Sequence, residues 1–219
     1  MTLAPRPSRY DYQQVTLSAQ EIAQGAHQHH LGGGPQAWQQ RGAFQLAALQ
    51  HLGLQPSDSV LDVGCGPLRG GIHLLSFLQP GNYWGFDFNT SFVAAAHAVL
   101  AKSGHSRATE QVMVLEDFDF ARLGRTFDWL LCFSVLNHCN AAQRTLFFER
   151  VRHAVHPRSR VLITHAGWFE PQQIQAQGLA VLQSFNTESS LGPHLQLQDW
   201  GFDDGVLDRL PFVVLGQRT

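Results

Sequence analysis

Apolar and polar positions along the middle of the chain follow two alternating patterns. Five short apolar runs have the length of buried strands. The segments after three of them repeat their apolar residues every three or four positions, as an amphipathic helix does. Because strands and helices alternate, the pattern favours a parallel sheet with helices on both faces. The predicted strands are 59–63, 83–87, 111–116, 127–133 and 160–164, and the predicted helices are 68–78, 90–102 and 140–155.

The pattern differs at the two ends of the chain. Ser18 and Glu21 form a capping box that opens a short helix, and a longer helix is predicted over 36–52. Between them, residues 27–35 are rich in glycine and histidine, and we expect a loop there. Toward the C-terminus two more strands are predicted, over 179–185 and 211–216, whereas 192–205 shows no clear pattern.

The simplest organisation is one compact domain, because 219 residues suffice for a single substantial core. Residues 57–219 would form its α/β part, and residues 1–56 a helical N-terminal extension that acts as a lid. Trp38 in that extension either lines a substrate pocket, together with Tyr10 and Tyr12, or packs in the core.

The link between the first strand and its helix carries the most specific chemistry. Gly64 and Gly66 lie in a turn where a strand ends and a helix begins. Glycine lets a ligand approach bare backbone, and a helix start adds free N–H groups and a positive dipole end. In an open parallel sheet, such a turn binds the adenosine part of a cofactor. A dinucleotide fingerprint needs a third glycine at the position of Arg69, so a nicotinamide cofactor is disfavoured.

Four segments in order resemble the class I S-adenosylmethionine (SAM)-dependent methyltransferases. They are similar to the first motif, the second strand with its terminal acid, the fourth strand with its loop, and the fifth strand, at 60–66, 83–87, 127–138 and 160–164. The chain departs from the family at Pro67 and Leu68, where many members carry a third glycine. The resemblance implies a Rossmann-like, mostly parallel sheet of seven strands whose last pair is antiparallel.

The resemblance also assigns contacts with SAM around the first turn. It implies that Gly64, Cys65 and Gly66 pass their backbone close to the cofactor. Asp62, one residue before the turn, would orient the methionine amino group, often through water. Arg69 either reaches the methionine carboxylate or is a solvated arginine in the first turn of the helix.

Acidic residues after the next two strands extend this expected site. Asp87 stands about twenty residues beyond the glycine turn, where a carboxylate can accept hydrogen bonds from both ribose hydroxyls. Its alternative is a turn-forming aspartate. Phe88, next to it, is also expected at the cofactor. For the adenine ring the resemblance implies an acid with an apolar neighbour, and we favour Asp117 with Phe118 over the acids on either side.

Residues after the fourth strand are expected beside the transferred methyl group, with Phe133 in contact with SAM. The sulfonium is an excellent leaving group, so the protein needs only to align the reacting atoms and exclude water. A hydroxyl or ammonium acceptor must also lose a proton, and histidine suits that task. His138 and His165 both follow strand ends, and each is either this base or a histidine that merely caps or packs.

Composition narrows the range of partners. The net charge is −2, and no run of Lys or Arg stands out, so nucleic acid is disfavoured because it needs a basic footprint. The three cysteines fit no zinc pattern and read as reduced thiols, and we expect no metal. No segment approaches the ~18 apolar residues of a membrane helix. We therefore expect a soluble, cytoplasmic protein with no membrane partner, and the oligomeric state stays open.

Together these features predict SAM-dependent methyl transfer to an oxygen or nitrogen of a small-molecule acceptor. A non-catalytic SAM- or nucleotide-binding sensor or scaffold is the first alternative, and an NAD-dependent oxidoreductase is the second. The acceptor itself stays open, because analogy at the level of the fold does not supply a substrate.

Overall fold

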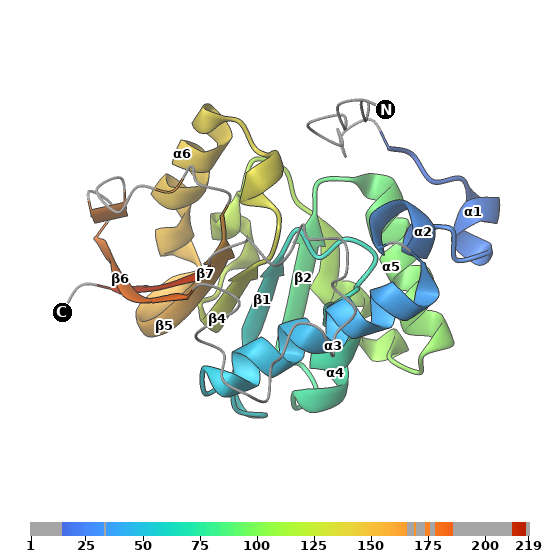
Figure 1. Cartoon of the computed structure of the whole chain (residues 1–219), viewed down its shortest axis with the longest axis horizontal. Helices are drawn as coiled ribbons and strands as arrows, with labels where there is room; N and C mark the ends of the chain where they lie inside the picture. The colour runs from blue at the N-terminus through green and yellow to red at the C-terminus, as the bar shows by residue number, and fades with distance from the viewer. Residues whose placement is uncertain are drawn as a thin grey trace, which may run out of the picture.

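The computed structural model describes residues 15–32, 34–165, 169, 174–175, 178–185 and 212–217. These residues form a sheet of seven strands in the order β3-β2-β1-β4-β5-β7-β6 (Figure 1). Strands β1 to β5 pair in parallel, whereas β7 pairs antiparallel with both β5 and β6. This confirms the predicted fold class. The strands are β1 (Val60–Val63), β2 (Tyr83–Asp87), β3 (Val112–Val114), β4 (Phe127–Cys132), β5 (Val155–Thr164), β6 (Leu179–Phe185) and β7 (Phe212–Gln217).

Helices cover both faces of the sheet. On one face α3, α4 and α5 pack over β1 and β2, and on the other face α6 packs near β4 (Figure 1). Short 3-10 turns η1 to η4 complete the connections, at Ser106–Gln111, Phe120–Leu123, Leu136–His138 and Val151–His153. The α-helices are α1 (Ala19–Ala23), α2 (His27–Gly32), α3 (Pro35–His51), α4 (Gly71–Phe77), α5 (Thr90–Lys102) and α6 (Ala141–Arg150).

The alternation of side chains along the strands divides the interior into two apolar cores. In β1, Val60 faces the core beneath α3, α4 and α5, whereas Leu61 and Val63 face the core beneath α6. All four residues of β1 are buried, as expected for a central parallel strand with helices on both faces. Asp62 is the polar member of this strand, and it lies on the same face as Val60.

The prediction of a loop over residues 27–35 was wrong for its first part, because α2 spans His27–Gly32. His27 is 4% exposed and packs edge-on against the Trp38 ring at 5.3 Å. Leu31, one helical turn later, packs against Leu17 and Phe92. Tertiary packing of this face stabilises the helix, and the sequence pattern missed it because histidine counts as polar.

Two other helix boundaries also differ from prediction. Helix α4 starts at Gly71 rather than 68, because Leu68 adopts a left-handed conformation with φ 64°, which cannot begin a helix. Helix α6 ends at Arg150 rather than 155, because Val155 already pairs with Phe127 as the first residue of β5.

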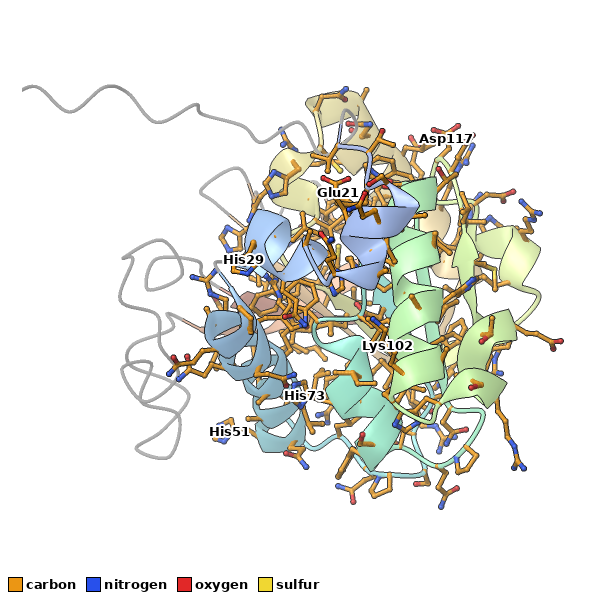
Figure 2. The ribbon with its side chains drawn as sticks, turned by 90° about the vertical axis from the view of Figure 1, so that its right-hand side faces the viewer. Glu21, His29, His51, His73, Lys102 and Asp117 are labelled. Atoms are coloured by element: carbon orange, nitrogen blue, oxygen red, sulfur yellow. The ribbon has the colours of Figure 1, made fainter. Side chains whose placement is uncertain are left out.

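The N-terminal segment lies against α5 and follows it from one end to the other. At the start of α5 the backbone N–H of Leu17 donates to Ser91 Oγ at 3.1 Å. At the end of α5 the ammonium of Lys102 donates to the Ala23 carbonyl at 3.0 Å (Figure 2). Within the described residues, no helix has both the length and the apolar character needed to cross a bilayer.

Candidate cofactor-binding site

The two glycines of the turn after β1 are required for different reasons. Both have positive φ, +68° at Gly64 and +51° at Gly66, which favours glycine. A Cβ at Gly64 would come within 2.5 Å of the Val135 side chain, so packing leaves no room there. A Cβ at Gly66 would meet no atom within 4 Å. Gly66 therefore exposes bare backbone to open space, where a ligand can make contact.

Backbone strain gathers at the carboxyl ends of the strands. In the described residues, the non-glycine positions with positive φ are Leu68, Asp117, Phe118 and Ser134, and they follow β1, β3 and β4. Such conformations are uncommon outside glycine and are concentrated at functional sites. The strained positions therefore lie at the same edge of the sheet at which the cofactor is predicted from the sequence.

Asp87 connects the end of β2 to the glycine turn. Its Oδ2 accepts a hydrogen bond from the Gly66 N–H at 3.0 Å, and its Oδ1 accepts one from the Asn89 N–H at 2.9 Å. Burial raises the pKa of the Asp87 carboxyl to about 6, against the effect of these backbone donors. The carboxylate is thus fixed beside bare backbone and is ionised at neutral pH.

Asp62 lies in the interior below the turn. Its Oδ2 accepts a hydrogen bond from the Tyr83 hydroxyl at 2.9 Å, and the side chain is 5% exposed. Burial raises its pKa to about 7, although the Tyr83 hydroxyl and the positive charge of Arg69 act in the opposite direction. Burial likewise raises the pKa of the Cys65 thiol, which is therefore neutral.

Arg69 contacts the N-terminal helices rather than lying in solvent. Its Nη1 donates to the Leu31 carbonyl of α2 at 3.1 Å, and its guanidinium lies 5.9 Å from the Trp38 ring centroid. Trp38 itself is 4% exposed, so it belongs to the core. Tyr10 and Tyr12, the other aromatic residues expected near a pocket, lie outside the described residues.

The residues predicted near the adenine ring separate into buried and exposed groups. Phe118 packs against Phe147 at a ring distance of 5.3 Å, so its ring is part of the core beneath α6. Asp117 is exposed and lies in the loop after β3 (Figure 2). Phe88, directly after Asp87, is 42% exposed and presents an aromatic ring to solvent. A hollow of about 550 Å³ lies beside this loop and is lined by Val114, Leu115, Glu116, Asp117, Asp119, Arg122 and Arg150.

The loop after β4 packs against the N-terminal extension. Phe133 is 8% exposed and makes an edge-to-face contact with Phe44 of α3 at 6.2 Å. The next residue, Ser134, donates its backbone N–H to Thr164 Oγ1 at the end of β5, at 2.7 Å. These contacts bring α3, the β4 loop and the end of β5 together.

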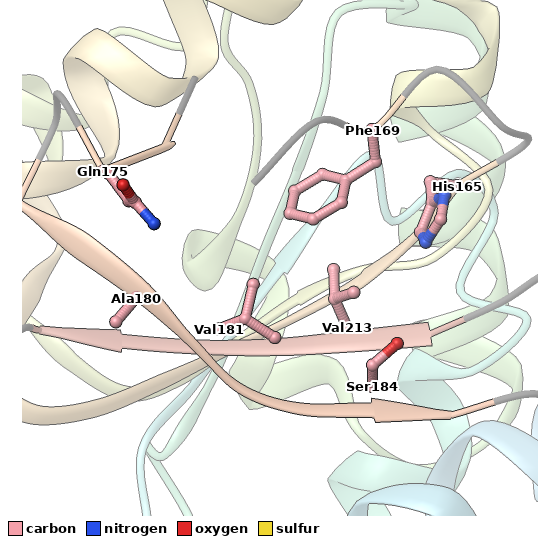
Figure 3. A pocket seen from close by; sticks show the side chains of 7 residues that line it. All are labelled: His165, Phe169, Gln175, Ala180, Val181, Ser184 and Val213. Carbon is pink, nitrogen blue, oxygen red and sulfur yellow. The ribbon is translucent and has the colours of Figure 1, made fainter. Parts of the chain in front are cut away.

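The two candidate bases lie in different surroundings. His138 belongs to η3 and is exposed. His165 is half-buried at the end of β5, where its ring lies 5.1 Å from that of Phe169. It lines a hollow of about 490 Å³, together with Phe169, Gln175, Ala180, Val181, Ser184 and Val213 (Figure 3). Burial lowers the pKa of His165, so its imidazole is neutral at pH 7 and able to accept a proton.

Sequence analysis missed the side chains that support the site from behind. The sequence indicated only that Tyr83 is an aromatic residue in a buried strand, although its hydroxyl contacts Asp62 on the neighbouring strand. The contact of Arg69 with Leu31 joins residues 38 positions apart, and no local pattern signals it. Among the described residues, no three His, Cys, Asp or Glu side chains are grouped as metal ligands.

Comparisons with known proteins give a family match for part of the chain and a fold shared with solved structures. Residues 60–158 match the family model described as a methyltransferase domain. The structure is similar to the glycopeptide N-methyltransferase MtfA, with a TM-score of 0.60 and 14% identity over 81% of this chain and 90% of that one. MtfA has also been solved with SAM and with sinefungin.

Two further structural neighbours act on different kinds of acceptor. The mitomycin 7-O-methyltransferase MmcR has a TM-score of 0.58 and 14% identity over 91% of this chain, which spans 60% of MmcR. A ribosomal protein methylase from Lactobacillus delbrueckii subsp. bulgaricus has a TM-score of 0.56 and 10% identity over 80% of this chain and 77% of that one.

The family match over residues 60–158 is to a methyltransferase domain, and the fold is shared with SAM-dependent methyltransferases, one of which has been solved with SAM bound. The residues present fit such a cofactor. Gly66 offers bare backbone next to open space, Asp87 offers a fixed carboxylate, and Phe88 offers an exposed aromatic ring.

Proposed function

We propose that this methyltransferase transfers the methyl group of SAM to an oxygen or nitrogen of a small-molecule acceptor. The observation that carries the acceptor assignment is the hollow beside His165 at the end of β5 (Figure 3). Its volume of about 490 Å³ is typical of small-molecule sites, and it combines apolar walls with a few polar groups. The net charge of −2 also argues against a nucleic-acid acceptor.

In this proposal the cofactor lies along the carboxyl ends of β1 and β2. The backbone of Gly64, Cys65 and Gly66 contacts the methionine part, and Asp62 receives its amino group. Asp87 accepts hydrogen bonds from the ribose hydroxyls. Support comes from the 3.0 Å hydrogen bond between the Gly66 N–H and Asp87, which joins the carboxyl ends of the two strands.

At the adenine end, we propose that the exposed ring of Phe88 packs against the base and that Asp117 receives its exocyclic amine. Exposure of both residues supports this assignment. Phe118, which packs against Phe147, and Phe133, which packs against Phe44, would contribute apolar surface to the site rather than stack directly on the base.

The N-terminal extension is proposed to be the cover of the site, and residues 57–219 the cofactor-binding part. Helix α3 packs closely on the turn after β1, since a Cβ at Gly42 would collide with the Arg69 carbonyl. Arg69 in turn donates to Leu31 of α2. Arg69 therefore joins the proposed cover to the segment that follows the glycine turn. This structural role is in addition to any contact of Arg69 with the methionine carboxylate.

We propose His165 rather than His138 as the general base. When bound, SAM supplies a methyl group activated by its sulfonium. In that transfer the acceptor oxygen or nitrogen would bond to the methyl carbon as its bond to sulfur broke, and His165 would take the proton that the acceptor loses. A neutral, half-buried imidazole beside a hollow is suited to this step.

A turnover assay tests this function. The protein is incubated with SAM and with phenols, carboxylic acids or amines in turn, and the formation of S-adenosylhomocysteine is measured. We expect turnover with at least one class, and a loss of about 100-fold or more in kcat for His165→Ala, with little change for His138→Ala. Retained turnover in His165→Ala would remove the proposed base. Turnover on a protein or nucleic acid but on none of the small molecules would overturn the acceptor class.

A further inference from the structure

The hydroxyl of Tyr83 occupies a closed socket beneath the glycine turn. Tyr83 is 1% exposed, and a Cβ at Gly71 would collide with its hydroxyl oxygen. A Cβ at Gly85 would lie 2.9 Å from the same oxygen. Two glycines from different elements, the start of α4 and the middle of β2, thus leave space for this single polar atom.

The hydroxyl in that socket is directed at one acceptor. Tyr83 pairs with Val60 in the β1–β2 ladder, two residues before Asp62, and its ring extends along the strand to bring the hydroxyl 2.9 Å from Asp62 Oδ2. Asp62 pairs with Gly85, whose lack of a side chain leaves this path clear. A phenylalanine would fill the apolar part of the same position, so the core alone does not require the hydroxyl.

We infer that Tyr83 is a positioning residue for the cofactor, whose hydroxyl fixes the Asp62 carboxylate in the orientation that receives the amino group of SAM. This inference rests on the proposed role of Asp62. It adds a supporting residue that does not touch the cofactor, in the way that an outer hydrogen bond orients a binding group.

The charges around Asp62 determine what the hydroxyl contributes. Arg69 and the Tyr83 donor stabilise the ionised carboxylate, whereas burial and the nearby Asp87 disfavour it. The thiols of Cys65 and Cys132 also lie within its electrostatic range. The hydroxyl is therefore the neutral donor that offsets burial, and without it Asp62 would be protonated over a wider pH range.

Calorimetric titration of Tyr83→Phe and the wild type with S-adenosylhomocysteine, repeated from about pH 5.5 to about pH 8.5, tests this inference. We expect affinity at neutral pH to fall about tenfold, and the pH midpoint of binding to move upward, because Asp62 loses the donor that favours its ionised form. The amino group of the ligand titrates equally for every variant, so the difference between proteins reports on Asp62. A merely structural tyrosine would lower the melting temperature and leave that midpoint in place.

Asp62→Asn separates this inference from the proposed function. If Asp62→Asn binds the ligand as tightly as the wild type, the role of Asp62 itself is wrong. If Asp62→Asn weakens binding but Tyr83→Phe changes neither affinity nor midpoint, the role of Asp62 stands and that of Tyr83 is refuted. Should Tyr83→Phe fail to fold, 3-fluorotyrosine at this position adds one small atom beside the hydroxyl and makes the hydroxyl a stronger donor. It is expected to lower the midpoint, and an unchanged midpoint would overturn the inference.

Discussion

Asp62 and Asp87 are buried carboxylates on adjacent strands, and burial raises the pKa of both toward neutrality. Each is supported by a different kind of donor, a tyrosine hydroxyl for Asp62 and backbone N–H groups for Asp87. A cationic donor such as SAM favours their ionised forms, so cofactor binding and protonation of these acids oppose each other.

Asp87→Asn is expected to weaken binding of S-adenosylhomocysteine about 100-fold, because the charged acceptor for two ribose hydroxyls is lost. For the wild type, affinity should also fall as the pH drops below about 6, where Asp87 becomes protonated. Calorimetry measures both effects. The exposed Glu110 provides the control Glu110→Gln, which should bind like the wild type. Equal affinity for Asp87→Asn would contradict the ribose role.

Asp62 also makes the stability of the protein depend on pH. Its folded-state pKa is raised from 3.8 to about 7, so its favourable contribution is fully present below about pH 4 and is lost as the pH rises through 7. Such a shift corresponds to about 4 kcal/mol as an order of magnitude. Asp62→Asn has no carboxyl group at this position and should not lose this contribution. Its free energy of unfolding in urea, relative to that of the wild type, should therefore increase as the pH rises from about 4 to about 7. A constant difference at all pH values would show that Asp62 is not buried as a neutral acid.

Some of these residues were predictable from sequence, and others were not. Gly64, Gly66 and Asp87 stand in local patterns at strand ends, where the chain itself defines their position. Tyr83 and the partner of Arg69 depend on contacts between elements far apart in sequence, which no periodicity encodes. The roles of the predicted residues in binding remain predictions until they are measured.

At the scale of elements, the turn after β1 offers a matched pair of substitutions. Gly64→Ala should lower stability by about 3 kcal/mol or more, because its Cβ collides with Val135 and its φ is strained. Gly66→Ala has a similar φ but open space, so we expect only about 1 kcal/mol of lost stability together with a large loss of cofactor affinity. Thermal unfolding and calorimetry distinguish the two. If Gly66→Ala bound the cofactor normally, its backbone would not be a contact surface.

The N-terminal helices provide a second test at this scale. Arg69→Gln should increase amide hydrogen exchange over residues 27–38 about fivefold, because the hydrogen bond to Leu31 and the contact with Trp38 are weakened. The control is Arg107→Gln on the exposed surface of η1, which should leave this region unchanged. Unchanged exchange in Arg69→Gln would show that other contacts hold helix α2 in place.

Helix α2 shows why sequence patterns missed one element. Its first residue, His27, is buried against Trp38, and its Leu31 packs with Leu17 of the preceding segment. The six residues of α2 are too few to show a recognisable amphipathic repeat, and both contacts are with residues outside the helix. Short helices of this kind are stabilised by tertiary contacts, and local propensity does not reveal them.

At the scale of the whole molecule, the alternation of strands and helices predicted the parallel part of the sheet, whereas the antiparallel final pair was implied by the family resemblance. This succeeded because central strands are buried on both faces and read as continuous apolar runs. The topology then places the carboxyl ends of β1, β2, β3 and β4 on one edge, and that edge holds Gly66, Asp87 and Phe88. The proposed acceptor site, in contrast, involves the proposed cover and the hollow near β6 and β7, where the sequence pattern is weak.

The central claim is that the proposed site at Gly66 and Asp87 binds a SAM-type ligand. The most direct measurement is calorimetric titration of the folded protein with S-adenosylhomocysteine, with NADH titrated in parallel. We predict binding of one ligand per chain, about 100-fold weaker binding in Asp87→Asn, and no binding of NADH. Absence of binding to the folded wild type, or binding that Asp87→Asn leaves unchanged, would contradict the account.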